Sequence, residues 1–135
     1  MIPLAQFCKQ LSLDLGLEEP LKEETPGVFN LAVEEDMIIK ISTVGEGVSF
    51  YAFLCECPKE NVELFLTDIM DANLYGYITR NAVLGLSEDG NQLTLSHTID
   101  YNIDYKTFNE LLQDFYNVAI FWREQTLNNL NVNRQ

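Results

Sequence analysis

The sequence is short of positive charge. Its 135 residues contain 8 lysines and arginines against 21 aspartates and glutamates, which gives a formal net charge of −13 at pH 7. Nucleic acids and anionic membranes are bound largely through lysine and arginine, so this composition argues against both as partners. A chain this acidic is expected to be highly soluble and to suit a basic or aggregation-prone partner.

Cysteines and long apolar runs are also scarce. The three cysteines, Cys8, Cys55 and Cys57, are an odd number and allow no closed set of disulfides. We therefore expect reduced thiols in a cytosolic protein. No stretch approaches the roughly 20 apolar residues of a membrane span. The N-terminus lacks the basic flank and long apolar run of a signal peptide.

Residues that carry catalysis are nearly absent. His97 is the single histidine, and there is no nucleophile elbow, phosphate-binding loop, dinucleotide glycine fingerprint or two-histidine zinc helix. Cys55-Glu56-Cys57 is the nearest approach to a metal motif, but a closed zinc site needs four ligands. The sequence therefore favours a binding protein, not an enzyme, and predicts no catalytic residues, metal or cofactor.

Apolar sequence is present in the amount that one folded domain needs. The chain is 47% apolar and 21% charged, and its length suits a single domain over residues 1–135. Periodicity predicts helices near 2–15, 59–74 and 105–127, and strands at 28–33, 37–42, 48–55, 82–87 and 92–99. The charged stretch 18–27 is predicted as a loop, and the tail 128–135 is expected to fray. The expected fold class is α+β with an antiparallel sheet, in the order helix, three strands, helix, two strands, helix.

The first three strands have a pattern that selects their pairing. Taking residues 34–36 as a three-residue hairpin loop makes every opposed pair on one face apolar. A four-residue loop over 44–47 then continues this face into the third strand, and a loop of five residues is the alternative. The face that we expect in the core consists of Phe29, Leu31, Val33, Met37, Ile39, Ile41, Phe50, Ala52 and Leu54.

The third strand, V-S-F-Y-A-F-L-C, is unusual because both of its faces are apolar. Tyr51, Phe53 and Cys55 fall opposite the core face, beside Ile38. Soluble proteins rarely expose such a patch unless a partner covers it. The alternative is that helices of the same chain cover both faces of the sheet.

The predicted helix 59–74 is also apolar over more than one face. All of its apolar residues but Leu64 fall within an arc of roughly 200°, whereas a surface helix needs a stripe of only about 100°. We expect this helix to be covered on two sides, by its own core and by something else.

Taken whole, the chain resembles the class I type III secretion chaperones, the family named for the Tir chaperone CesT and for SycE. The order of helices and strands is the same over nearly the full chain. Three segments carry the resemblance: the N-terminal L-A-Q-F-C-K-Q-L-S-L-D-L-G-L, the helix end L-F-L-T-D-I-M-D-A-N-L-Y-G, and the closing F-N-E-L-L-Q-D-F-Y-N-V-A-I-F-W-R-E-Q.

The resemblance implies a homodimeric chaperone of the bacterial cytoplasm that uses no ATP. It would bind the N-terminal segment of a secreted effector in extended form, keep it soluble and present it to the secretion apparatus, whose ATPase is a further expected partner. The expected dimer interface is Phe65, Ile69, Met70, Asn73 and Leu74. The expected client-binding patch is Leu4, Phe7, Val28, Ile38, Tyr51 and Phe53.

Two other functions remain open from the sequence. One is an acidic regulatory binding protein, such as an anti-activator or a mimic of nucleic-acid charge. The other is a small-molecule enzyme. Salt separates the first from a chaperone, because binding through apolar patches weakens slightly with salt and charge mimicry weakens steeply.

Overall fold

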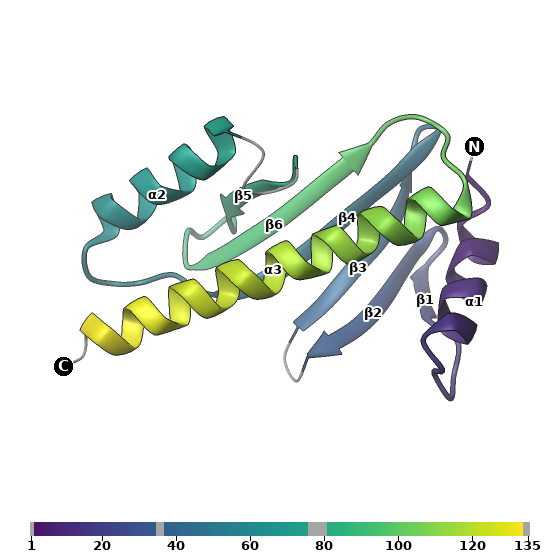
Figure 1. The fold of residues 1–135 in the computed structure, drawn as a ribbon, viewed down its shortest axis with the longest axis horizontal. Coiled ribbons are helices and arrows are strands. Elements are labelled where there is room, and N and C mark those ends of the chain that lie inside the picture. The colour runs from purple at the N-terminus through teal and green to yellow at the C-terminus, as the bar shows by residue number, and fades with distance from the viewer. Residues whose placement is uncertain (1, 35–36, 76–80, 134–135) are drawn as a thin grey trace.

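The chain forms one antiparallel sheet that the long C-terminal helix crosses on one side (Figure 1). The computed structural model describes residues 2–34, 37–75 and 81–133. The strands lie in the order β1-β2-β3-β4-β6-β5, and the predicted α+β class is confirmed, with one strand added. In chain order these residues form α1 (Leu4–Asp14), β1 (Lys22–Thr25), β2 (Val28–Glu34), β3 (Met37–Val44), β4 (Gly47–Glu56), α2 (Val62–Tyr75), β5 (Val83–Leu86), β6 (Gln92–Ile99) and α3 (Tyr105–Asn133).

The added strand is β1, which lies in the charged stretch that the sequence predicts as a loop. It pairs with β2, with Lys22 opposite Asn30 and Glu23 opposite Phe29. All its side chains are exposed, so the apolar alternation that marks a strand is absent. The loop prediction is wrong because a short edge strand needs only backbone pairing, and charged side chains suit it to solvent.

The predicted core face of the first three strands is confirmed. Phe29 pairs with Ile41, Ile41 with Phe50, and Ile39 with Ala52. All five side chains are buried. The apolar pattern therefore selected the correct register, because a slip of one residue would turn these side chains to the other face.

The two turns between these strands differ in detail from the prediction. A bulge near the end of β2 places Glu34 opposite Met37, where Val33 was expected. At the second turn, β3 and β4 stay paired as far as Val44 and Gly47, so two residues form the turn in place of four. Residues 35–36 of the first turn lie outside the described residues.

The helix ends also differ from the prediction. α2 begins at Val62, not near residue 59, because Asn61 has a positive φ of 55° that a right-handed helix does not continue through. The expected stop at Gly76 lies outside the described residues. α3 runs to Asn133, past the expected end near residue 127, because no glycine or proline interrupts the last segment.

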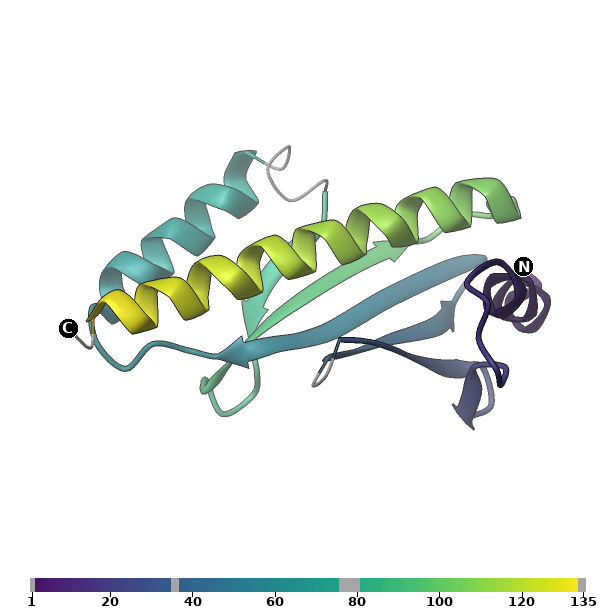
Figure 2. The same cartoon turned by 60° about the horizontal axis from the view of Figure 1, so that its bottom comes forward.

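The core fills the space between the sheet and α3. The ring of Phe50 in β4 lies 5.8 Å from that of Phe108 and 5.6 Å from that of Phe115, and both partners are on α3. α1 closes one end of this cluster through Phe7, whose ring is 5.3 Å from Phe108. In the described part of the chain, no helix lies over the opposite face of the sheet (Figure 2).

Candidate binding surfaces

The uncovered face of the sheet carries the apolar side chains that the sequence predicts there. Phe53 and Ile38 are 45% and 50% exposed, and Tyr51 is partly exposed. The rings of Tyr51 and Phe53 pack edge to face with their centroids 5.4 Å apart. Within the described residues, the alternative that helices cover both sheet faces is wrong. Ile38, Tyr51 and Phe53 are named the outer patch.

The other three predicted client-binding residues do not join this patch. Leu4 and Phe7 are only 4% and 9% exposed, because α1 turns them into the core. Their predicted place on an accessible surface is therefore wrong. Val28 does share the outer face. Its neighbours across the sheet are Ser42 on β3 and Ser49 on β4, so polar side chains continue its row and Val28 does not extend the outer patch.

Cys55 lies on the opposite face from the one predicted. Phe53 is opposite Thr94, whereas Cys55 is opposite Leu93, so a bulge between them inserts one residue into β4. The bulge turns the end of the strand over. The Cys55 thiol consequently faces α3, within hydrogen-bonding reach of Thr126.

The thiols and the histidine show no sign of chemical activation. Burial raises the pKa of Cys8 to about 12 and that of Cys55 to about 11, so both stay protonated at neutral pH. Burial also lowers the pKa of His97. Among the described residues, no three histidine, cysteine or acidic side chains converge as metal ligands. No helix in that part of the chain has both the length and the apolar character to cross a membrane.

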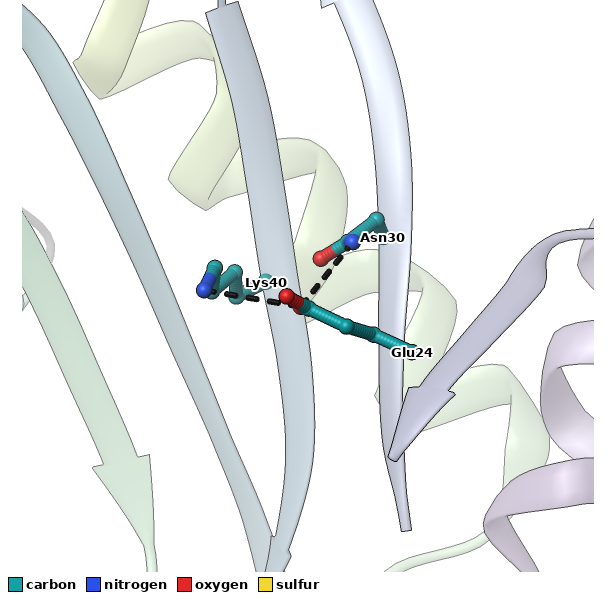
Figure 3. Close-up of polar contacts among 3 residues, drawn as sticks. All are labelled: Glu24, Asn30 and Lys40. Carbon is teal, nitrogen blue, oxygen red and sulfur yellow. Dashed lines mark hydrogen bonds and ion pairs between the residues drawn. The ribbon is translucent and has the colours of Figure 1, made fainter. Parts of the chain in front are cut away.

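A polar cluster adjoins the outer patch across a hollow of about 290 Å³ (Figure 3). Glu24 Oε2 accepts a hydrogen bond from Asn30 Nδ2 at 3.1 Å and lies 3.5 Å from Lys40 Nζ. The hydrogen bond from Asn30 and the charge of Lys40 hold the pKa of the Glu24 carboxyl below its usual value. Asn30 Oδ1 is shielded from solvent and has no hydrogen-bond partner among the described residues.

An apolar groove on the helical side was not predicted. It has a volume of about 380 Å³ and lies between α1, β2 and α3. Leu15 and Leu17 line it and are 53% and 40% exposed. The sequence predicts a helix near 2–15 in this region and assigns no binding role to Leu15 or Leu17. The signal that would have revealed the groove is that leucines continue past the stop at Gly16. This space is named the inner groove.

The inner groove opens beside an unpaired stretch of strand edge. β1 begins at Lys22, opposite Asn30, so it covers only the first part of β2. From Leu31 to Glu34, no strand in the described chain pairs with β2 on that side. Leu31 and Val33 of this stretch also line the groove. An open edge beside an apolar groove is the geometry that lets an extended peptide add to a sheet.

α2 has a buried side and an exposed side. Ile69 is 5% exposed and belongs to the core of its own chain, so its predicted place in a dimer interface is wrong, and Phe65 packs partly against the same core. Met70 and Leu74, one turn apart, are 70% and 77% exposed. With Leu66 they form an apolar row at i, i+4 spacing, which is named the α2 face.

Asn73, the remaining predicted interface residue, is occupied within the chain. Its side chain donates to the carbonyl oxygen of Leu84 and accepts from the Leu84 N–H, both at 2.8 Å. These bonds attach α2 to the edge strand β5.

Comparisons with known proteins identify the family of the chain and its fold. Residues 6–123 match the sequence profile of the Tir chaperone protein (CesT) family. No curated protein sequence matches the chain.

Several solved structures share the fold. A chain of the ExsC–ExsE complex superposes with a TM-score of 0.72 at 16% identity, over 91% of this chain and 92% of that chain. A chain of the HopA1–SchA chaperone–effector complex gives 0.63 at 17% identity, over 88% and 91% of the two chains. The Yersinia pestis structure of the type III secretion chaperone SycH with a stable fragment of YscM2 gives 0.63 at 13% identity, over 87% and 97%.

Proposed function

Because this chain belongs to the Tir chaperone protein (CesT) family, we propose that it binds the N-terminal segment of a type III secreted effector in extended form. The family resemblance that the sequence predicts is confirmed by the match over residues 6–123. In our proposal the chain keeps the effector soluble in the bacterial cytoplasm and delivers it to the secretion apparatus, where the ATPase is its partner. It acts by binding and release, without catalysis. One of the structural relatives is itself a chaperone–effector complex, which supports the proposal.

The observation that carries the proposal is the open edge of β2 beside the inner groove. A segment that adds to the edge at Leu31–Glu34 pairs with backbone groups that no described strand reaches on that side. Successive side chains of a strand point to opposite faces, so alternate client residues would enter the inner groove. The others would lie over the outer face of the sheet.

The outer patch is the second contact in this proposal. Ile38, Tyr51 and Phe53 present apolar surface on a face that the described helices leave bare. Burying one such side chain fully contributes roughly 1.5–3 kcal/mol. The segment therefore gains affinity from both faces of the sheet, from the inner groove beside β2 and from the outer patch on β3 and β4.

We further propose that two copies pair through the α2 face. Met70 and Leu74 are among the most exposed apolar side chains of the chain that the structure describes. They sit on a helix whose inward side is already buried, so covering them requires a second molecule. A dimer would present two client surfaces to one segment.

The test begins with affinity purification of the tagged chain from its own bacterium, with mass spectrometry to name the client. The client's N-terminal segment is then co-expressed, and amide hydrogen exchange of the complex is compared with that of the free chain. We expect new protection at residues 31–34, on the edge that the client covers. Binding without such protection would contradict edge addition.

A matched pair of variants tests the inner groove. Leu15→Glu places a charge in the groove, whereas Leu13→Glu makes the same change at a neighbouring leucine that is 69% exposed and does not line it. We expect the first variant to lose client binding and the second to keep it.

The net charge of −13 keeps the acidic regulatory protein as the second candidate. Client affinity measured across a range of salt concentrations decides between the two. Capture by apolar surfaces changes little with salt, and charge mimicry weakens steeply.

A further inference from the structure

The polar cluster beside the outer patch has one acceptor without a donor. A carboxylate only accepts hydrogen bonds, so the nitrogen of the Asn30 amide must face Glu24. Figure 3 shows the amide oxygen of Asn30 on the side nearer Lys40. Asn30 Oδ1 is shielded and unpaired among the described residues. A shielded acceptor weakens the fold until a donor reaches it.

The hollow beside this acceptor has a distinctive lining. It brings together the Glu24 carboxylate, the Asn30 amide and the rings of Tyr51 and Phe53, with Ala52 between the two rings along β4. A side chain that suits these groups must donate hydrogen bonds, carry positive charge and tolerate aromatic surroundings. The guanidinium group has five N–H donors and no acceptor, pairs with carboxylates and stacks on aromatic rings.

We propose that this hollow is a subsite for an arginine side chain of the bound segment. The guanidinium group donates to Glu24 and to Asn30 Oδ1 while its flat face lies against Tyr51. The inference rests on the proposed function, because the client supplies the arginine. The net charge of −13 adds a long-range attraction for any basic segment.

In the free chain, Lys40 pairs with the same Glu24 carboxylate and so competes with the arginine for it. Its Nζ lies 3.5 Å from Glu24 Oε2, and both side chains are 48% exposed. Exposed pairs of this kind are weak, so an arginine that also pairs with Asn30 and the rings displaces the lysine. The proposal therefore makes opposite predictions for two residues of one ion pair. Removing Glu24 weakens binding, and removing Lys40 strengthens it.

The experiment uses N-acetyl-arginine-N-methylamide as the probe, titrated into the full ¹⁵N-labelled chain and followed by NMR. We expect amide shifts centred on Lys40, Tyr51 and Phe53. The neutral citrulline analogue should bind at least about fivefold more weakly, because it keeps the shape and loses the charge-assisted bonds.

Three variants sharpen the result. Glu24→Gln should weaken the probe about fivefold, and Lys40→Met should tighten it about twofold, in keeping with an exposed ion pair. Glu23→Gln is the control, because it makes the same change of charge on the preceding residue. The Glu23 charge acts on Cys8 in the core, so this variant should leave the affinity for the probe unchanged.

Several outcomes overturn the proposal. If Lys40→Met weakens binding of the probe, Lys40 does not compete with it for Glu24, and the proposed displacement is wrong. If neither Glu24→Gln nor Lys40→Met changes the affinity, the hollow is apolar only. If the amide shifts are spread evenly over the acidic surface, the probe is attracted by charge alone and the hollow is not a binding site. Client capture is measured separately. If the chain captures its client but does not bind the arginine probe, the subsite proposal is wrong and the proposed function stands. If the chain binds the probe but captures no client, the proposed function is wrong.

Discussion

Asn73 in α2 is hydrogen-bonded in both directions to the backbone of Leu84 in β5, at 2.8 Å each way. Its side-chain amide takes the place that a neighbouring strand would have beside this edge strand. The two bonds fix the end of α2 against the sheet and so set the direction of the α2 face. Asn73 thus belongs to the machinery that positions the proposed interface, not to its surface.

Asn73→Ala should lower the free energy of unfolding by about 1–3 kcal/mol, because it leaves a partly buried N–H and C=O of Leu84 without partners. Urea denaturation measures the loss. Asn117→Ala, at an exposed position on α3, is the control and should cost nothing. Equal stability of the two variants would show that the Asn73 bonds contribute little to the fold.

The double variant Met70→Glu, Leu74→Glu should convert the dimer to a folded monomer. The two side chains are exposed within one chain, so charging them costs little stability in the monomer but places carboxylates in a desolvated contact of the dimer. Light scattering measures the mass, and the control Leu13→Glu, Leu15→Glu makes the same change at the C-terminal end of α1, away from α2. A wild-type chain that is monomeric at micromolar concentration would rule the interface out.

The strand faces and the fold class were predictable because they follow from the spacing of apolar residues along short segments of the chain. In β4, Phe50 and Ala52 face the core while Tyr51 and Phe53 do not, and a period of two residues suffices to say so. For α2, the same periodicity did not predict which side chains face the core. Its apolar arc predicts two covered sides, but the arc is continuous, so it does not say that Ile69 faces inward and Met70 outward.

The features that the sequence did not predict depend on backbone pairing between distant segments. β1 is polar on both faces, and only the neighbouring β2 makes it a strand. The bulge before Cys55 reverses the end of β4 without any glycine or proline to signal it. The inner groove exists because α1 and α3 leave a space over Leu31, which is a matter of how three elements pack.

Gly47→Ala should destabilise the fold by about 1–3 kcal/mol or more, as overpacking of a tight site does. A Cβ at this position would lie 1.7 Å from the carbonyl oxygen of Ile99 and 2.8 Å from that of Tyr101, and backbone atoms cannot turn away. Gly85→Ala is the control, since its nearest neighbour is the Thr94 hydroxyl oxygen at 3.3 Å. Thermal melting of both variants should show the larger drop for Gly47→Ala, and the reverse order would contradict the close approach.

Tyr105→Phe should raise the pKa of the Asp14 carboxyl toward its ordinary value. The Tyr105 hydroxyl donates to Asp14 Oδ2 at 2.6 Å and, with a weaker contribution from Gln10, lowers that pKa in the folded chain. A lowered pKa stabilises the fold above the unfolded value, and the stabilisation is lost as pH falls through the folded value. The variant should therefore show a smaller loss of stability on acidification.

NMR titration of the side-chain carboxyl carbon measures the Asp14 pKa directly. Tyr101→Phe removes a hydroxyl from a side chain that is 61% exposed, and it should leave the Asp14 pKa unchanged. An unchanged pKa in Tyr105→Phe would mean that this hydrogen bond does not hold the carboxylate in solution.

The double variant Tyr51→Ser, Phe53→Ser should stay folded and dimeric but lose its client. Phe53 is 45% exposed and Tyr51 is partly exposed, so their removal opens no cavity in the core. Each anchor contributes roughly 1.5–3 kcal/mol when a client covers it, so losing both should weaken binding about a hundredfold or more. Tyr101→Ser, Phe121→Ser is the matched control, because it removes one tyrosine and one phenylalanine that are 61% and 49% exposed elsewhere. Thermal melting and client co-purification are read side by side. If the Tyr51, Phe53 variant unfolds, these rings serve the fold, and if it folds and captures the client as well as the control does, the outer patch is not a binding surface.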